Sequence, residues 1–255
     1  MKGLLATMRN AISEAAANRK GLAFAMTVMI LNDVMWIAFW LIFFRTAASV
    51  RGWDRDQVLM LLAVLTTSGG IALGLLANAR RLGTMALGGE LDAILNLPVQ
   101  PLAFLLVRRI EPTNLGDVVF GLGLFAIAGH PTPMRALVFV LVVAASSTLI
   151  VSFLVLTGSL AFFIGRNDGG ELGFHALLLL GAYPADVFAG AAKVMLYTVV
   201  PAAFVSSVPA RLVNSFELRE ATLLLAVASA FAGAAIAVFH RGLRRYRSGA
   251  VWTRA

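Results

Sequence analysis

Residues 21–44, GLAFAMTVMILNDVMWIAFWLIFF, form an apolar stretch long enough to cross a lipid bilayer as one helix, since about 20 such residues span the hydrocarbon core. Comparable stretches follow at residues 57–78, 135–164 and 220–240. The chain has 60% hydrophobic and only 13% charged residues, whereas about a quarter of the residues in a soluble domain are charged. We therefore predict an all-α polytopic membrane protein, with residues 1–255 forming a single transmembrane domain.

Two further crossings are predicted in less regular segments. Residues 114–129 form a short apolar stretch, and another runs from residue 172 to about Tyr183. Prolines interrupt the following segment, 184–209, too often for a further complete span. We predict that it forms re-entrant helices that dip into the outer leaflet and return, which requires protein or a wet cavity around their backbone. The prediction is thus six transmembrane helices.

The distribution of positive charge predicts the orientation of these crossings. The net charge is +8, but the cations lie in short clusters between apolar stretches, so we do not expect nucleic-acid binding. Most of the 21 lysines and arginines fall on one side of a six-span topology: Lys2, Arg9, Arg19, Lys20, Arg80, Arg81, Arg108, Arg109, Arg166 and the arginines of residues 241–254. The positive-inside rule makes this side, with both termini, cytoplasmic.

The first 20 residues carry apolar side chains at helical spacing, including Leu4, Leu5, Met8 and Ile12. This pattern predicts an amphipathic helix lying in the cytoplasmic membrane interface. A disordered tail is the alternative interpretation.

Motifs for catalysis or for a bound cofactor are missing from the sequence. There is no cysteine, and the three histidines lie in different segments, so no metal site is predicted. No nucleophile elbow or phosphate-binding loop occurs, and we predict no catalytic residue and no nucleotide site on this chain. An intramembrane enzyme that uses scattered polar residues is a weaker alternative.

A distinctive polar segment, residues 79–113, separates the second and third predicted crossings and contains GGELDAILNLPVQPLAF at residues 88–104. Its apolar residues recur at helical spacing and Pro98 ends the pattern, which predicts a short amphipathic cytoplasmic helix. Such a helix is suited to a groove on a cytoplasmic partner, although a loop lying flat on the membrane is an alternative. The residues concerned are Gly89, Glu90, Leu91, Asp92, Ile94, Leu95, Leu97 and Pro98.

Polar residues inside the first span are the candidates for a translocation path. Asn32, Asp33 and Trp36 lie near its middle, where a lipid-facing carboxylate would cost at least about 2.5 to 3.5 kcal/mol. Asp33 therefore faces protein or a cavity, either as a polar lining or counter-charge for a cationic substrate, or as a partner in a structural hydrogen bond. Asp117 is interpreted as favouring the start of the third helix, and glycines such as Gly70, Gly121 and Gly123 mark places where helices could approach closely.

Three stretches together resemble the uncharacterised permeases of the second exporter class of ATP-binding-cassette (ABC) transporters. They are IAFWLIFFRTAASVRGWDRDQVLMLLAVL at residues 37–65, GELDAILNLPVQPL at residues 89–102 and YPADVFAGAAKVMLYTVVPAAFVSSVPA at residues 183–210. The match covers most of the chain, and the three patterns occur in the order found in that family. One departure is the serine pair Ser206 and Ser207, where an aromatic residue is expected.

This resemblance implies a permease subunit of an ABC exporter in the bacterial cytoplasmic membrane. It implies two ATPase subunits that bind ATP and magnesium, and a second permease that is a sister chain rather than a copy of this one. The segment at residues 89–98 would be the coupling helix. The extracellular gate would comprise Tyr183, Pro184, Tyr197, Pro201 and Phe204. A stand-alone secondary transporter or channel driven by an ion gradient is the alternative, and the sequence does not identify the substrate.

Overall fold

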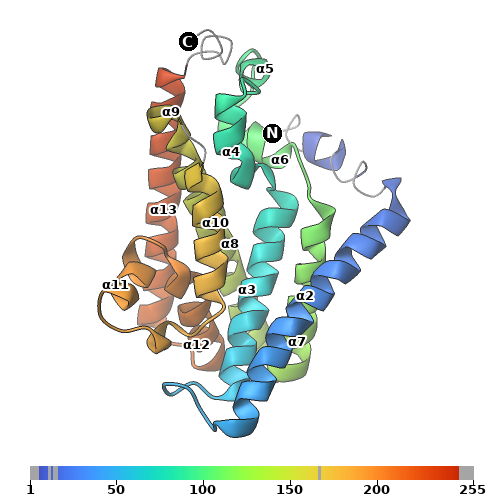
Figure 1. The fold of residues 1–255 in the computed structure, drawn as a ribbon, viewed down its shortest axis with the longest axis vertical. Coiled ribbons are helices and arrows are strands. Elements are labelled where there is room, and N and C mark those ends of the chain that lie inside the picture. The colour runs from blue at the N-terminus through green and yellow to red at the C-terminus, as the bar shows by residue number, and fades with distance from the viewer. Residues whose placement is uncertain (1–5, 11–12, 14–16, 166–167, 247–255) are drawn as a thin grey trace.

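The structure, a computed structural model, describes residues 6–10, 13, 17–165 and 168–246, and its regular elements within these ranges are all helices (Figure 1). Four are long and apolar enough to cross a membrane: α2 (Arg19–Thr46), α3 (Arg55–Leu75), α8 (Pro133–Ser159) with its extension α9 (Ala161–Ile164), and α13 (Leu218–Arg245). This confirms the prediction of an all-α protein with several membrane-spanning helices. Half of the residues of the predicted interfacial helix, 1–20, lie outside the described ranges, so this helix stays a prediction.

Two bent pairs of helices bring the number of candidate spans to as many as six. The first pair is α6 (Pro101–Val107) with η1 (Pro112–Asn114) and α7 (Leu115–Ala128), bent by 71°. The second is α11 (Gly190–Thr198) with the π-helix η3 (Ala203–Ser207) and α12 (Val208–Asn214), bent by 66°. The third predicted crossing, at residues 114–129, thus corresponds to α7, and α6 extends it upstream through the bend.

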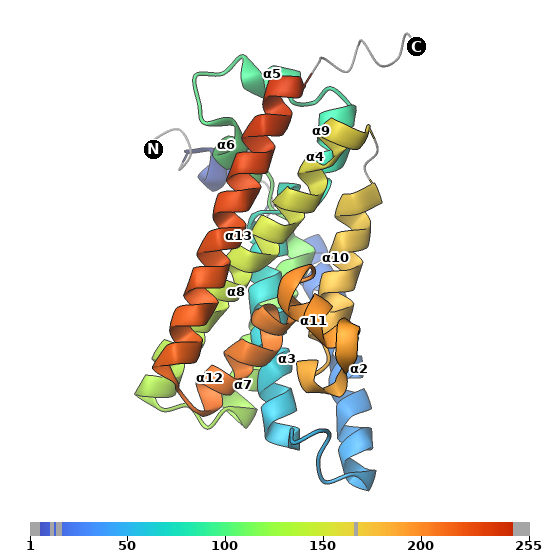
Figure 2. The same cartoon turned by 90° about the vertical axis from the view of Figure 1, so that its left-hand side faces the viewer.

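The predicted fifth crossing corresponds to α10 (Asp168–Gly181), an apolar helix of 14 residues. It is shorter than the roughly 20 residues that a complete span requires. After α10 comes η2 (Ala185–Val187), and the chain then folds back through α11 towards α12 (Figure 2). The proline-rich segment is therefore built from short helices, and α13 begins only after them.

A break after α3 produces a helix that the sequence analysis did not predict. The second span was expected to reach residue 78, but α3 ends at Leu75, and α4 (Asn78–Leu87) begins after a short turn. The Asn78 side chain is buried and donates a hydrogen bond to the Leu105 carbonyl at 2.8 Å. Spacing along the sequence does not reveal this contact, so the break was not predicted. This bond ties α4 to α6 and positions α5 (Asp92–Leu95) at the end of the bundle (Figure 1).

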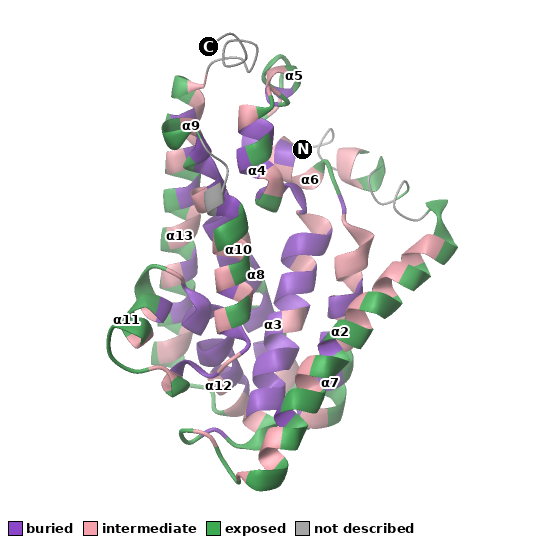
Figure 3. Ribbon diagram, viewed as in Figure 1, coloured by how far each residue is buried: buried purple, intermediate pink, exposed green. Residues whose placement is uncertain are grey.

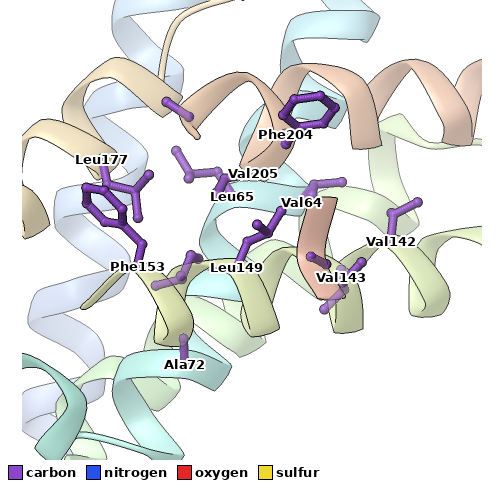
Figure 4. Close-up of a cluster of buried hydrophobic side chains, with 14 of the residues drawn as sticks. Val64, Leu65, Ala72, Val142, Val143, Leu149, Phe153, Leu177, Phe204 and Val205 are labelled. Atoms are coloured by element: carbon purple, nitrogen blue, oxygen red, sulfur yellow. The ribbon is translucent and has the colours of Figure 1, made fainter. Parts of the chain in front are cut away.

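The core is organised around α3, which is buried on nearly every side. In its most apolar 18-residue window, 83% of the residues are buried, against 11% in α2 and 22% in α13. Figure 3 shows the same contrast along the three helices. Val64 and Leu65 of α3 lie in a cluster with Leu149 and Phe153 of α8, Leu177 of α10, and Phe204 and Val205 of η3 (Figure 4).

Glycines set the closest approach in this core, where α3 crosses α7. A Cβ atom added at Gly70 would lie 2.7 Å from the Asn114 carbonyl oxygen and 2.8 Å from the Val118 nitrogen. One added at Gly121 would collide with the Thr66 and Thr67 hydroxyls. Small residues are what allow helix backbones to approach in this way. Gly123, in contrast, has open space around it and is not part of the crossing.

The Gly121→Ala variant should therefore lower stability, because the added methyl group forces α7 away from α3. Overpacking of this kind costs about 1 to 3 kcal/mol. The measurement is the thermal unfolding midpoint of the purified protein in mild detergent. Gly123→Ala is the matched control and should leave the midpoint unchanged or slightly higher, since alanine is the better helix former. Equal losses in the two variants would contradict this account of the crossing.

Candidate functional site

A cavity of ≈ 240 Å³ lies among α2, α3, α7 and α10. Most of its wall is apolar, and the polar exceptions come from all four helices. The lining residues are Met29, Asn32, Asp33 and Trp36 of α2, Leu62, Leu65, Thr66, Gly69 and Leu73 of α3, Asp117 and Phe120 of α7, and Phe174, His175, Leu178, Leu179 and, just beyond its end, Ala182 of α10. The cavity is therefore a site to which four separate parts of the chain contribute.

All three residues proposed for a translocation path, Asn32, Asp33 and Trp36, line this cavity. The Asp33 side chain is only 6% exposed, and its Oδ2 atom is buried without a hydrogen-bond partner. A buried polar atom in this state is unusual and needs an explanation. No hydrogen bond to a neighbouring helix accounts for this oxygen among the described residues, and its role in a path stays a prediction.

Asp117 joins Asp33 on the cavity wall, which the sequence analysis did not foresee. It lies in the first turn of α7, as expected for a carboxylate near a helix start. However, it is 9% exposed, and its Oδ1 atom is buried without a hydrogen-bond partner. The two carboxyl groups therefore line the same cavity, from α2 and from α7. A carboxylate in the first turn of an apolar helix has the same sequence pattern whether it faces water or a cavity.

The predicted gate meets the predicted path at Tyr183. Its ring lies 6.0 Å from that of Trp36 and 5.8 Å from that of Trp40, in edge-to-face arrangements. Tyr197 and Phe204 form a second edge-to-face pair at 5.5 Å. The aromatic half of α2 thus packs partly on this chain's own Tyr183. The structure does not bring all five gate residues into one contact group.

The serine pair that departs from the expected pattern has a clear structural place. Ser206 and Ser207 are both fully buried within η3. The Ser207 hydroxyl accepts a hydrogen bond from the Ala185 backbone N–H at 2.9 Å. This bond joins η3 to the turn after Pro184. An aromatic side chain would have to displace the packing around it, so the serine pair suits the site.

A partly buried ion-pair cluster around Asp186 was missed by the sequence analysis. Asp186 accepts hydrogen bonds from Lys193 at 2.7 Å, from Arg211 at 2.7 Å and from the Trp53 ring nitrogen at 3.0 Å. Trp53 is only 4% exposed. The cluster ties the α11–α12 region to the turn before α3. An aspartate and a lysine seven residues apart in an apolar segment were its only sequence signal.

The electrostatics of this cluster favour the ionised carboxylate. Partial burial acts to raise the pKa of Asp186, but hydrogen bonds from Lys193 and Trp53 and the charges of Arg211 and Lys193 outweigh it. The pKa of Asp186 therefore lies below its usual range.

The predicted coupling segment protrudes at the end of the bundle where α13 ends, opposite the turns that join α2 to α3 and α12 to α13 (Figures 1 and 2). Its short helix, α5, ends before Pro98, as expected. Leu91 and Ile94 are buried against the protein, whereas Leu95 and Leu97 are 39% and 43% exposed. Glu90 is exposed and lies 3.9 Å from Arg81. Only part of the predicted apolar face is thus available to a partner.

Comparison with known proteins adds the family. A family model described as ABC-2 family transporter protein matches residues 30–250. The chain belongs to the ABC-2 transporter family. No curated protein and no solved structure matches it. As an ABC-2 protein it is a multi-pass membrane permease, a transport subunit rather than a catalytic one, of a family that works with ATPase subunits.

The Asp186 cluster of this ABC-2 permease predicts a pH-dependent stability. Because the pKa of folded Asp186 is below that of the unfolded chain, its contribution is complete above the unfolded value of about 4 and is lost as the pH falls through the folded value. Asp186→Asn should therefore unfold at a lower temperature than wild type at pH 7, by the equivalent of about 1 to 3 kcal/mol. The gap should narrow below pH 4.

The measurement is the unfolding midpoint of both proteins in detergent at pH 7 and near pH 3. Asp56→Asn is the matched control, since Asp56 pairs only with Arg55 on the surface, where ion pairs contribute little. A gap that stays constant between the two pH values would show that the charge of Asp186 is not what stabilises the cluster.

Proposed function

We propose that this ABC-2 permease forms, with a second permease, the substrate path of an exporter in the bacterial cytoplasmic membrane. Two separate cytoplasmic ATPase subunits, which bind the ATP and magnesium, drive it. The observation that carries this proposal is the family match over residues 30–250. A sister chain is the favoured second permease.

The proposed topology has six crossings with both termini in the cytoplasm. The basic residues support this orientation, because Arg244 and Arg245 end α13 at the same end of the bundle as α4, which carries Arg80 and Arg81 (Figure 1). In this topology α10 enters from the cytoplasmic side, and α11 to α12 form the re-entrant segment in the outer half. Protein around these short helices can satisfy their backbone groups.

The coupling role is proposed for the exposed part of residues 89–98. Leu91 and Ile94 anchor the short helix to the permease, while Leu95, Leu97 and Glu90 are free to contact an ATPase groove. An apolar pair beside a carboxylate offers both burial and orientation to a partner. The ATPase would therefore push on a segment that is fixed to the permease by its inner face.

Arg80 provides a physical route from this segment to the cavity. It lies on α4, which leads into the coupling segment, and pairs with Glu171 of α10 at 2.5 Å. Its guanidinium group also lies 4.0 Å from the centre of the Phe174 ring, and Phe174 lines the cavity. We propose that movement of α4 shifts α10 through these contacts and thereby reshapes the cavity and the contacts of Tyr183.

A transporter working alone on an ion gradient is the second candidate. The buried Asp33 and Asp117 favour it, because such proteins carry ionisable groups inside the membrane. The two candidates differ in whether a partner ATPase is bound, so one experiment separates them.

The experiment is a pull-down of the tagged permease from its native membrane in mild detergent, with subunits identified by mass and ATP hydrolysis measured. The double variant Leu95→Asp, Leu97→Asp should lose most of the copurifying ATPase, because it places two charges where apolar contact is needed. The double variant to methionine is the control and should retain it, since the surface stays apolar.

Two results would count against the proposal. In one, no ATPase copurifies with the wild-type permease; in the other, the aspartate variant retains the ATPase. The first result would favour the hypothesis of a transporter that works alone on an ion gradient. In the second, the coupling contact lies elsewhere. Size-exclusion chromatography shows whether the variants remain folded.

A further inference from the structure

The cavity contains two carboxyl groups that have no positively charged partner on this chain among the described residues. Neither Asp33 nor Asp117 has an ion-pair partner among the described residues, and each has a buried oxygen with no hydrogen bond. No lysine or arginine lines the cavity. An ionised carboxylate that is buried without a partner costs several kcal/mol, so a carboxyl group in this position takes up a proton unless a cation lies beside it. A positive group that enters the cavity would therefore allow these side chains to be ionised and would be held by them.

A metal ion does not suit this position. Hard cations such as calcium need six to eight oxygen ligands, and transition metals need a compact set of three or four. Among the residues that the structure describes, no group of three or more His, Cys, Asp or Glu side chains could hold a metal ion. His175 also lines the cavity, but its Nδ1 atom faces the Glu171 carbonyl oxygen at 2.9 Å.

The remaining wall matches an organic ligand. Aromatic rings come from three helices: Trp36 of α2, Phe120 of α7 and Phe174 of α10. Such rings attract organic cations through their faces, most strongly when water is excluded. Leucines from α3 and α10 supply the rest of the apolar surface. The volume of ≈ 240 Å³ is just below the roughly 300 to 1,000 Å³ of typical ligand pockets.

We propose that this cavity binds a small monovalent organic cation with an aromatic or aliphatic body, and that Asp33 and Asp117 together hold its charge. The class of ligand is that of quaternary ammonium compounds and lipophilic amines. The site stands on its own geometry. That such cations are also the transported substrates rests in addition on the function proposed above.

The test uses benzyltrimethylammonium, which keeps its charge at every pH, and the purified permease in detergent without any ATPase. Binding is measured by isothermal titration calorimetry. Wild type should bind the cation, and Asp33→Asn and Asp117→Asn should each raise its Kd at least tenfold, equivalent to about 1.4 kcal/mol. Asp56→Asn removes the same charge from the surface and should leave the Kd unchanged.

A second measurement does not depend on variants and remains decisive if they fail to fold. Benzylsulfonate has a similar size and the opposite charge, so wild type should bind it at least tenfold more weakly than the cation. Equal binding of the two ligands, no binding of the cation, or an unchanged Kd in both carboxylate variants would overturn the proposal.

These results are separable from those of the pull-down. A permease that binds the cation selectively but captures no ATPase keeps the site and loses the exporter function. A permease that captures an ATPase but does not bind the cation keeps the exporter function and loses the site.

Discussion

The close crossing of α3 and α7 is the constraint on which the other packing depends. Because Gly70 and Gly121 bring the two backbones together, α3 can be enclosed by α7 and α8 along most of its length. Close approach of this kind gives α3 extensive van der Waals contact with its neighbours, and the Ser147 hydroxyl of α8 adds a hydrogen bond to the Ser68 carbonyl of α3 at 3.2 Å. The short helices η3 and α12 then pack on the same α3–α8 core.

Carboxyl groups that are buried or partly buried have two different environments in this protein. Asp186 is surrounded by Lys193, Arg211 and Trp53 and joins distant segments. Asp33 and Asp117 have no such partners. A carboxylate with cationic partners holds the segments that carry them together. A carboxyl group without such partners can interact with a ligand instead. The contrast separates the structural role of Asp186 from the binding role proposed for Asp33 and Asp117.

Much of the fold could be predicted from the sequence because the spans are long and apolar. The four long helices lie where hydropathy placed them, and the short helix before Pro98 forms as expected. The irregular region was harder, since α10 and α11 are too short for periodicity to separate a span from a re-entrant segment. The break before α4 depends on the Asn78–Leu105 hydrogen bond, which joins residues 27 positions apart.

For the site, sequence analysis selected Asn32, Asp33 and Trp36, which share one cavity. It could do so because a polar side chain within an apolar span is costly in lipid and therefore faces protein or a cavity. Asp117 and the Asp186 cluster could not be assigned in the same way, since their surroundings depend on how α7 and α12 are arranged in space. Likewise, the inward direction of Leu91 and Ile94 could not be separated from the outward direction of Leu95 by spacing alone.

The sparse packing of α2 has an evolutionary consequence. This helix provides a quarter of the residues that line the cavity, yet most of its most apolar window lies outside the core. Substitutions at Met29, Asn32 or Trp36 alter the cavity without repacking α3. Ligand preference can therefore diverge among descendants of one ancestral permease while the scaffold is preserved, and selection for a new ligand would act first on α2.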